Sequence, residues 1–173
     1  MKIGIYSDLH VSYQTSLMPV FTENSKYTTR LQMCIDTGKW MYDIFEKESV
    51  ELILNGGDTF DSHTVRAEEL SALSEFYSYS RGTQEIHIPG NHEILDENCT
   101  FYSDSILKNY PFIILYNEPC KVNDFLSVLP YMKSENVTDK LLESIENKIL
   151  LSHIDIKGSH LRPDFLFESG VEP

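Results

Sequence analysis

Short apolar segments alternate along this chain with longer segments whose apolar residues recur at helical spacing. The short segments cover residues 2–7, 50–54, 84–88, 112–115, 125–129 and 148–151, and the longer ones cover residues 27–48, 64–80, 101–109 and 137–147. Over residues 27–48 the spacing is that of an amphipathic helix, with Ser25 as the expected N-cap. Strands that alternate with helices predict an α/β fold in which helices are layered on a sheet.

Length and composition indicate a single intracellular domain. A chain of 173 residues is long enough for one domain with a sizeable core. No apolar run approaches the roughly 20 residues that cross a bilayer, so no membrane association is expected. The N-terminus lacks the pattern of a signal peptide, and the three cysteines are far apart. Their odd number fits a reducing cytoplasm better than a disulfide framework.

The formal net charge of −13 constrains the substrates that the chain can attract. Non-specific binding to nucleic acids depends on Lys and Arg side chains that neutralise phosphates, and this chain has few of them. An acidic protein can still act on phosphates if bound cations reverse the sign of the charge locally. Activity on a phosphate compound would therefore require a metal site.

Side chains of the types that bind metals follow four of the predicted strands, at the point where each strand ends. In open α/β sheets, ligands bind in the crevice at the carboxyl ends of the strands. We therefore expect these residues to converge on one edge of the sheet. In chain order they are Asp8, His10, Asp58, Asp61, His63, Asn91, His92, Glu93 and His153.

The donor types indicate which ions such a site would hold. Carboxylate, imidazole and amide groups without thiolate suit Mn²⁺, Fe or Zn²⁺ in a reactive site rather than a structural zinc site. Asp8 and His10 are two apart, so on a β-like segment they would share a face and reach one ion. Asp58 has two oxygens and can bridge two ions, and two-metal sites clamp the oxygens of a phosphoryl displacement. Glycines at 56, 57 and 90 allow the sharp turns that this requires.

Four short motifs together resemble those of a known family. The segments Asp8-Leu9-His10, Gly57-Asp58-Thr59-Phe60-Asp61 and Gly90-Asn91-His92-Glu93 resemble the first three motifs of the calcineurin-like metallophosphoesterases, and His153 in LLSHID resembles the fourth. The resemblance covers the whole chain. It implies a four-layer α/β/β/α sandwich with mixed sheets and a centre of two divalent metal ions, with Mn²⁺ expected and Fe or Zn as alternatives.

The resemblance also implies a role for each matched residue. Asp8 and His10 would hold one metal, Asp58 would bridge, and Asn91 and His153 would hold the second metal. His92 would act near the leaving group, as a general acid or as a stabiliser of the transition state. Asp61 would orient His92 through a carboxylate–imidazole pair. Glu93 would have a structural or supporting role.

Two further stretches, GDTFDSH and SVLPYMK, look most like the SbcD type, the nuclease subunits of double-strand-break repair exonucleases, including phage counterparts. This resemblance implies DNA as the substrate. For the full-length protein it implies an SbcC-type ATPase partner and a homodimer. The location would be the cytoplasm of a bacterium, or of the host for a phage-encoded protein.

The fifth motif of the family, Gly-His-x-His, does not occur in the chain. Gly158-Ser159-His160 has the wrong spacing and only one histidine. We therefore expect residues 1–173 to be the N-terminal part of a longer nuclease, without that segment and without a capping domain. One donor would be missing from each metal, so the chain alone is expected to be weakly active or inactive.

Two other functions fit the same motifs. The first is a small phosphatase or phosphodiesterase that acts on nucleotides or phosphoproteins. Phosphoprotein phosphatases usually continue the second motif with Arg-Gly, where this chain has Ser62-His63. The second is a non-catalytic binding module that kept the fold and lost the metal centre. Such a module would show no Mn²⁺-dependent thermal shift and no activity at any metal concentration.

Overall fold

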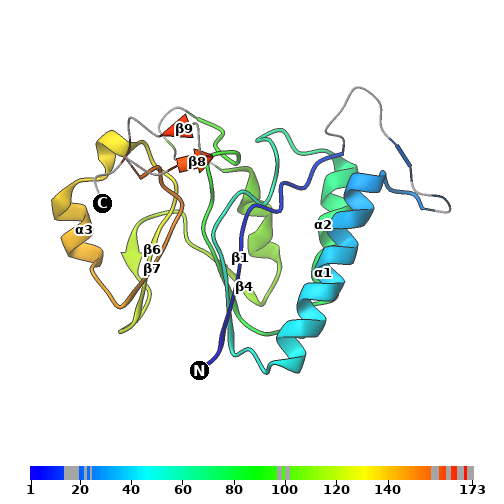
Figure 1. The fold of residues 1–173 in the computed structure, drawn as a ribbon, viewed down its shortest axis with the longest axis horizontal. Helices are drawn as coiled ribbons and strands as arrows, with labels where there is room; N and C mark the ends of the chain where they lie inside the picture. The colour runs from blue at the N-terminus through cyan, green and yellow to red at the C-terminus, as the bar shows by residue number, and fades with distance from the viewer. Residues whose placement is uncertain are drawn as a thin grey trace.

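Two β-sheets pack face to face, and helices cover the outer side of each sheet (Figure 1). The structure is a computed structural model that describes residues 1–13, 20–21, 23, 25–96, 99, 102–156, 160–162, 165–166 and 170. The first sheet is parallel and contains, in spatial order, β1 (Ile3–Tyr6), β2 (Leu52–Asn55), β3 (Glu85–His87) and β4 (Ile113–Leu115). In the second sheet, β6 (Leu126–Leu129) pairs antiparallel with β5 (Cys120–Lys121) and parallel with β7 (Ile149–Ser152).

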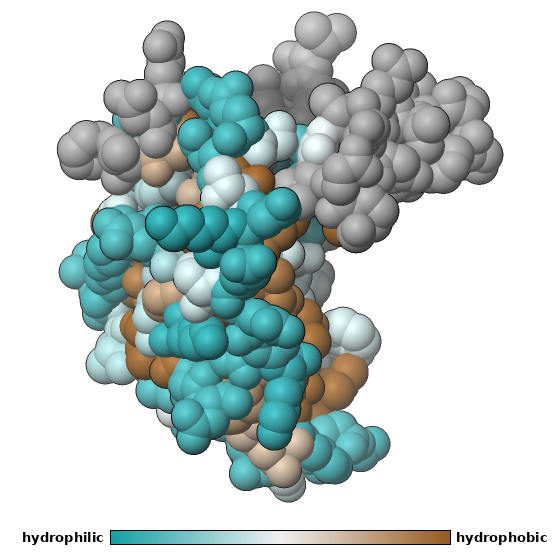
Figure 2. All heavy atoms as spheres, turned by 90° about the vertical axis from the view of Figure 1, so that its left-hand side faces the viewer, coloured by the Kyte–Doolittle hydropathy of each residue, from teal (hydrophilic) through white to brown (hydrophobic). Residues whose placement is uncertain are grey.

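The helices complete a four-layer α/β/β/α sandwich, as the family resemblance implied. Helices α1 (Thr29–Lys47) and α2 (Ala67–Ser78) cover the first sheet, and α3 (Asp139–Ile145) lies outside the second (Figure 1). Figure 2 shows mainly hydrophilic side chains on the outer face that carries α3. The remaining elements are two 3₁₀ helices and a short antiparallel pair of strands: η1 (Ser103–Asn109), η2 (Ser134–Asn136), β8 (His160–Arg162) and β9 (Phe165–Leu166).

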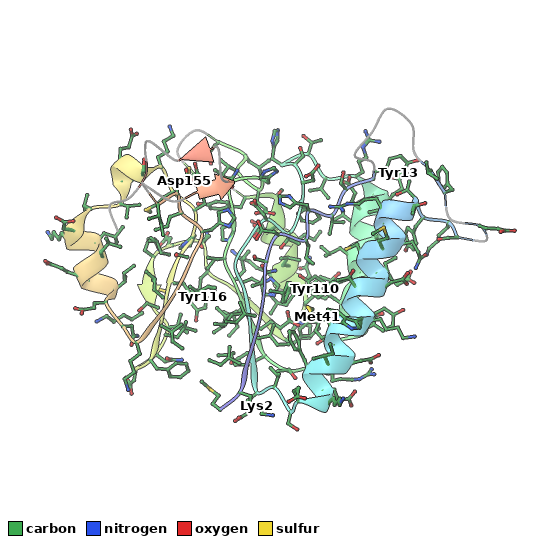
Figure 3. The ribbon with its side chains drawn as sticks, in the orientation of Figure 1. Lys2, Tyr13, Met41, Tyr110, Tyr116 and Asp155 are labelled. Atoms are coloured by element: carbon green, nitrogen blue, oxygen red, sulfur yellow. The ribbon has the colours of Figure 1, made fainter. Side chains whose placement is uncertain are left out.

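The central strands β2 and β3 of the first sheet are buried on both faces, which explains the continuous apolar run of β2. Ile53 faces the helices, where it joins a core with Leu31 and Phe76. Its neighbours Leu52 and Leu54 point the opposite way and pack against the second sheet. Figure 3 shows Met41 and Tyr110 on the helix side and Tyr116 between the two sheets. The side chains of β2 therefore alternate between two separate cores.

Some local predictions are wrong or incomplete. The N-cap of α1 is Thr28, whose hydroxyl accepts the Leu31 N–H at 3.4 Å, and not Ser25, which instead accepts the Tyr27 N–H at 3.0 Å. The segment predicted as a helix at 101–109 is the 3₁₀ helix η1. Strands β5, β8 and β9 were not predicted. Gly158 and Ser159 lie outside the described residues.

Within the described part of the chain, none of the helices combines the length and the apolar character that a bilayer span requires. The longest, α1, has polar and charged side chains along its exposed side. The helices instead cover the sheets.

Candidate metal centre

Parallel pairing continues beyond the ends of β1 and β2 and brings two of the predicted motifs together. The N–H groups of Asp8 and His10 donate to the carbonyl oxygens of Gly57 and Asp58, each at 3.0 Å. The first motif, which follows β1, therefore runs beside the second motif, which follows β2. The turn after β3 and the end of β7 complete the edge, where the His153 N–H donates to the Leu129 carbonyl oxygen at 3.2 Å.

Asp58 lies at the centre of this edge, with three imidazoles around one carboxylate oxygen. Its Oδ2 lies 3.8 Å from His10 Nε2, 3.6 Å from His153 Nε2 and 4.0 Å from His92 Nε2. His10 Nε2 also lies 3.8 Å from Asp8 Oδ1. Metal–ligand bonds to N and O are about 2.0–2.2 Å, so two donors of one ion lie at most about 4.4 Å apart. All four pairs satisfy this limit.

The side of Asp58 that carries His153 has a hydrogen-bond pattern that a cation would complete. His153 Nδ1 lies 2.8 Å from the Gly56 carbonyl oxygen, which can only accept, so Nδ1 carries a proton. In the neutral ring, Nε2 then offers only a lone pair. It lies 3.0 Å from the Asn91 amide oxygen, which is also an acceptor. A cation between the two acceptors would satisfy both, and the Gly56 contact orients the ring for it.

Two overlapping groups of donors could hold an ion. The first is Asp8, His10 and Asp58, and the second is His10, Asp61 and His92; in each group the donor atoms all lie within 4.8 Å of one another. The first matches the ligands predicted for one metal. The second was not predicted as a metal group. The donors are oxygen and imidazole nitrogen throughout, so the residues suit Mn²⁺, Fe or Zn²⁺.

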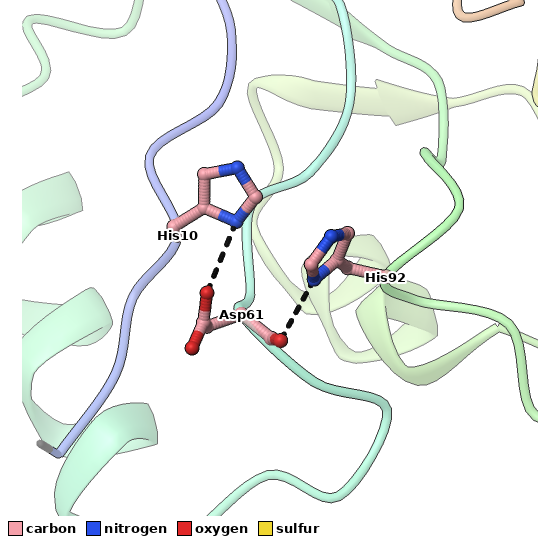
Figure 4. Close-up of side chains that lie close together, drawn as sticks. All are labelled: His10, Asp61 and His92. Atoms are coloured by element: carbon pink, nitrogen blue, oxygen red, sulfur yellow. Dashed lines mark hydrogen bonds and ion pairs between the residues drawn. The ribbon is translucent and has the colours of Figure 1, made fainter. Parts of the chain in front are cut away.

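The predicted pair between the Asp61 carboxylate and His92 is wrong. His92 Nδ1 lies 2.8 Å from the backbone carbonyl oxygen of Asp61 (Figure 4). The Asp61 carboxylate lies instead 3.4 Å from His10 Nδ1. The carbonyl still sets the His92 tautomer, because it requires the proton on Nδ1. The Asp61 carboxylate faces His10 Nδ1 without a hydrogen bond between them, while His10 Nε2 faces Asp8 and Asp58.

Hydrogen bonding raises the pKa of His92. The largest cause is the bond to the Asp61 carbonyl oxygen, and the negative charges of Asp58 and Asp61 act in the same direction, while burial opposes them. A raised pKa keeps more of the imidazole protonated near neutral pH. This suits a side chain that donates a proton.

The expected ligands adopt a strained backbone. Asp8, His10 and Asp58 have φ angles of 57°, 44° and 51°. The β-like segment predicted for Asp8 and His10 is therefore wrong, because both residues are left-handed. Each such residue costs on the order of 1–3 kcal/mol, and conformations of this kind cluster at functional sites. The left-handed turns aim the side chains at the strand ends.

Glu93 holds the strained turn at Asp58 through hydrogen bonds from the backbone. It is fully buried, and its Oε2 accepts the N–H groups of Asp58 at 3.1 Å and Gly90 at 2.8 Å. Its Oε1 accepts the N–H of Phe60 at 2.8 Å. Burial raises the pKa of Glu93, and the backbone donors oppose that shift. The sequence analysis gave Glu93 a supporting role, and the structure provides the mechanism: it ties the turn after β2 to the turn after β3.

Gly90 allows Asp58 to approach closely. A Cβ at position 90 would overlap Asp58 Oδ1 and would lie 2.6 Å from the Asp58 backbone nitrogen. Gly57 is equally constrained, since its φ is +100° and a Cβ there would lie 2.7 Å from the Gly90 nitrogen. Any side chain at either position would push the two turns apart. The glycines of both motifs are therefore required by packing at the centre.

Comparison with known families supports what the geometry indicates. The family model for the calcineurin-like phosphoesterases matches residues 1–169. A search among curated proteins gives no match to the chain. The matched region includes all the motifs, the sandwich and the strand ends described above. The chain therefore belongs to the calcineurin-like phosphoesterase family, whose members are metal-dependent hydrolases of phosphoesters.

Proposed function

We propose that this protein hydrolyses phosphodiester bonds in DNA, as a nuclease of the SbcD type. The observation that carries the proposal is the segment that leaves β6, Leu129-Pro130-Tyr131. The Tyr131 N–H donates to the Pro89 carbonyl oxygen at 3.1 Å, beside the turn that holds Asn91 and His92. The centroid of the Tyr131 ring lies 6.2 Å from that of the His153 ring. A partly exposed aromatic ring beside the centre provides a surface on which a nucleobase can stack.

The accessibility of the centre supports a large substrate. The side chains of Asp8, Asp61 and His92 are 56%, 45% and 37% exposed. Asp58, by contrast, is 5% exposed and forms the floor. The outer side chains of the centre can therefore meet a polymer from solvent, while the central carboxylate stays fixed.

Each residue has a defined task in the proposed reaction. Bound divalent ions would polarise the phosphoryl group and supply an activated water. The side chains that would hold them are Asp8, His10, Asp58, Asn91 and His153. His92 would donate the proton on Nε2 to the departing alkoxide, with its ring held by the Asp61 carbonyl oxygen. The Asp61 carboxylate would hold His10 in position.

The proposal extends to ions and partners. Mn²⁺ is the ion we expect, because hard oxygen donors and imidazole suit it. For a protein of the SbcD type, an SbcC-type ATPase and a second copy of the chain are the proposed partners, in the cytoplasm. Bound cations would offset the local negative charge that otherwise repels a phosphate backbone.

One observation favours a second candidate, the hydrolysis of a small phosphodiester. The net charge of −13 opposes the approach of a long polyanion much more than that of a single phosphate group. A small substrate would need only the metal centre and His92. The two candidates differ in substrate size and share the same chemistry.

Hydrolysis of a linear DNA duplex should be measured beside that of a small chromogenic phosphodiester, with Mn²⁺ titrated in both assays. Asp58→Asn and His92→Gln are the test variants, and Glu143→Gln on the exposed side of α3 is the control. Mn²⁺-dependent cleavage of DNA that both test variants abolish would support the nuclease. Cleavage of the small substrate alone would support the second candidate. An Mn²⁺-dependent thermal shift without cleavage is the result expected if the missing Gly-His-x-His donors are needed for activity. No thermal shift and no activity on either substrate would refute both candidates.

A further inference from the structure

A row of buried polar side chains lies beneath α1 and α2, behind the metal centre. Glu85, His87, Asn55 and Thr59 are each at most 1% exposed. Burying such groups is costly unless their hydrogen bonds are satisfied. None of the four belongs to the proposed ligand set, yet the row ends at the turn that carries Asp58.

Strand pairing brings the members of the row together. Tyr6 of β1 is in register with Asn55 of β2, and Asn55 is in register with His87 of β3. In a parallel sheet, residues in register project from the same face, and so does Glu85, two residues before His87. The row is therefore a consequence of sheet register.

Glu85 is the anchor at the far end of the row. One oxygen accepts the Tyr42 hydroxyl at 2.7 Å, and the other accepts the Tyr6 hydroxyl and His87 Nε2, each at 3.0 Å. Burial raises the pKa values of Tyr6 and Tyr42, so both remain hydroxyl donors. An ionised Glu85 accepts three hydrogen bonds, and one of them requires a proton on His87 Nε2.

Asn55 connects the row to the turn, and the backbone decides which way its amide points. The Gly57 N–H lies 2.8 Å from Asn55 Oδ1, and a backbone N–H can only donate. The Asn55 oxygen must therefore face Gly57, and the nitrogen Nδ2 faces His87 Nδ1 and the Thr59 hydroxyl, each at 3.3 Å. Because Nδ2 is a donor, His87 Nδ1 must accept. His87 is then neutral, with its one proton on Nε2.

We propose that Glu85, His87 and Asn55 form a relay that positions Asp58 for metal binding. Glu85 fixes the tautomer of His87, and the lone pair on His87 Nδ1 then holds the Asn55 amide in the orientation that the Gly57 N–H selects. This inference rests on the proposed metal-binding function of Asp58. The three side chains are positioning residues, because none of them touches the substrate or the proposed metals.

The turn needs such a support because its backbone is strained. Gly57 and Asp58 have φ angles of 100° and 51°. Two buried acceptors hold successive N–H groups of this turn, Asn55 at Gly57 and Glu93 at Asp58. The Gly57 carbonyl oxygen in turn accepts the Asp8 N–H at 3.0 Å. A shift at Asn55 would therefore displace two expected ligands, Asp58 and Asp8.

The first test needs no metal. In the full chain labelled with ¹⁵N at histidine, long-range ¹H–¹⁵N correlation spectra at neutral pH report the tautomer of His87. The expected result is a neutral ring protonated at Nε2. A ring protonated at Nδ1, or at both nitrogens, would refute the relay, because Asn55 Nδ2 would then face a second donor.

The second test separates positioning from stability. His87→Leu removes the acceptor that faces Asn55, whereas His87→Asn keeps an acceptor oxygen at the position of Nδ1 and leaves a larger void. We expect His87→Leu to weaken Mn²⁺ binding by about 10–100-fold, as loss of an outer hydrogen-bond partner does. The melting temperature of His87→Asn should be no higher than that of His87→Leu, yet His87→Asn should bind Mn²⁺ more tightly than His87→Leu. If Mn²⁺ affinity instead followed melting temperature across the variants, the relay would be only structural.

Tyr42→Phe is the matched control. It removes one of the three donors to Glu85 and leaves the Gly57 contact intact, so it should lower the melting temperature without changing Mn²⁺ affinity. If the unmodified protein binds no Mn²⁺, the proposed function fails. The tautomer of His87 and the hydrogen-exchange protection of the Gly57 N–H, compared between wild type and His87→Leu, still decide whether the relay exists.

Discussion

Replacing Glu93 by Gln should loosen the turn that carries Asp58. The carboxylate accepts three backbone N–H groups, from Asp58, Phe60 and Gly90, and it uses both oxygens to do so. A glutamine amide has one oxygen and one NH₂ group. If the glutamine oxygen takes the place of Oε2, its NH₂ group faces the Phe60 N–H. If the oxygen instead takes the place of Oε1, the hydrogen bonds from the Asp58 and Gly90 N–H groups are lost. At least one buried donor is left unsatisfied in either case.

The size of the effect follows from two opposing contributions. A hydrogen bond to a charged group contributes about 1.5–3 kcal/mol, and an unsatisfied buried N–H costs about 1–3 kcal/mol. Against this, glutamine removes the cost of burying a carboxylate, a cost apparent in the raised pKa of Glu93. We expect a net loss of about 1–3 kcal/mol, a large part of the 5–15 kcal/mol that is typical of a domain. The relaxed turn should also lower Mn²⁺ affinity by roughly 10-fold.

Urea denaturation in EDTA at pH 7, followed by Mn²⁺ titration of the folded proteins, measures both quantities. Glu143→Gln provides a matched control, because the same change at an exposed site of α3 should stay within about 0.5 kcal/mol of the wild type. If Glu93→Gln also stays within that range and binds Mn²⁺ normally, Glu93 does not hold the turn.

Three further variants test other parts of the structure. Burial, with the nearby charge of Glu93, raises the pKa of Asp104 to about 8 from an unfolded value of about 3.9. The folded state therefore holds this proton more tightly, and its contribution to stability is lost as pH rises from about 4 to about 8. Asp104→Asn should flatten that dependence in urea melts, and an unchanged slope would contradict the assignment. Gly90→Ala should lower stability by about 1–3 kcal/mol and abolish the Mn²⁺-dependent thermal shift, because the new Cβ displaces Asp58. Thr28→Ala should cost about 1 kcal/mol as a lost N-cap, and Ser25→Ala clearly less; equal losses would refute the assignment of the cap.

The layering of helices on a parallel sheet and the convergence of the motifs could be predicted because both depend on periodicity and chain direction, whereas the four-layer sandwich was implied by the family resemblance. Alternating strands and helices indicate parallel pairing, and the carboxyl ends of parallel strands meet at one edge. Asp8, Asp58 and Asn91 each follow a strand, so their proximity required only that those strands pair. No detailed side-chain geometry was needed.

The cap and the Asp61 contact could not be predicted, because both depend on the path of loops. Ser25 and Thr28 are equally suitable N-caps by residue type. Thr28 is selected because its hydroxyl also donates to the Tyr13 carbonyl oxygen at 2.8 Å, a contact made by the loop after β1. The Asp61 carboxylate faces His10 rather than His92 because the left-handed turns at Asp8, His10 and Asp58 redirect the segments that carry them. Motif spacing contains no information about such turns.

The buried row behind the centre has a different origin, which explains why the pattern of a single strand assigns no role to His87. The sequences of β1 and β2 are apolar apart from Tyr6 and Asn55, and β3 contains two polar residues, Glu85 and His87. These residues acquire a meaning only when register sets Tyr6 against Asn55 and Asn55 against His87. The separate polar residues then become one connected network, and its last hydrogen bond is made to the Gly57 N–H. A polar residue inside an apolar strand is therefore best judged together with its partners in register, because its hydrogen bonds are made across the sheet.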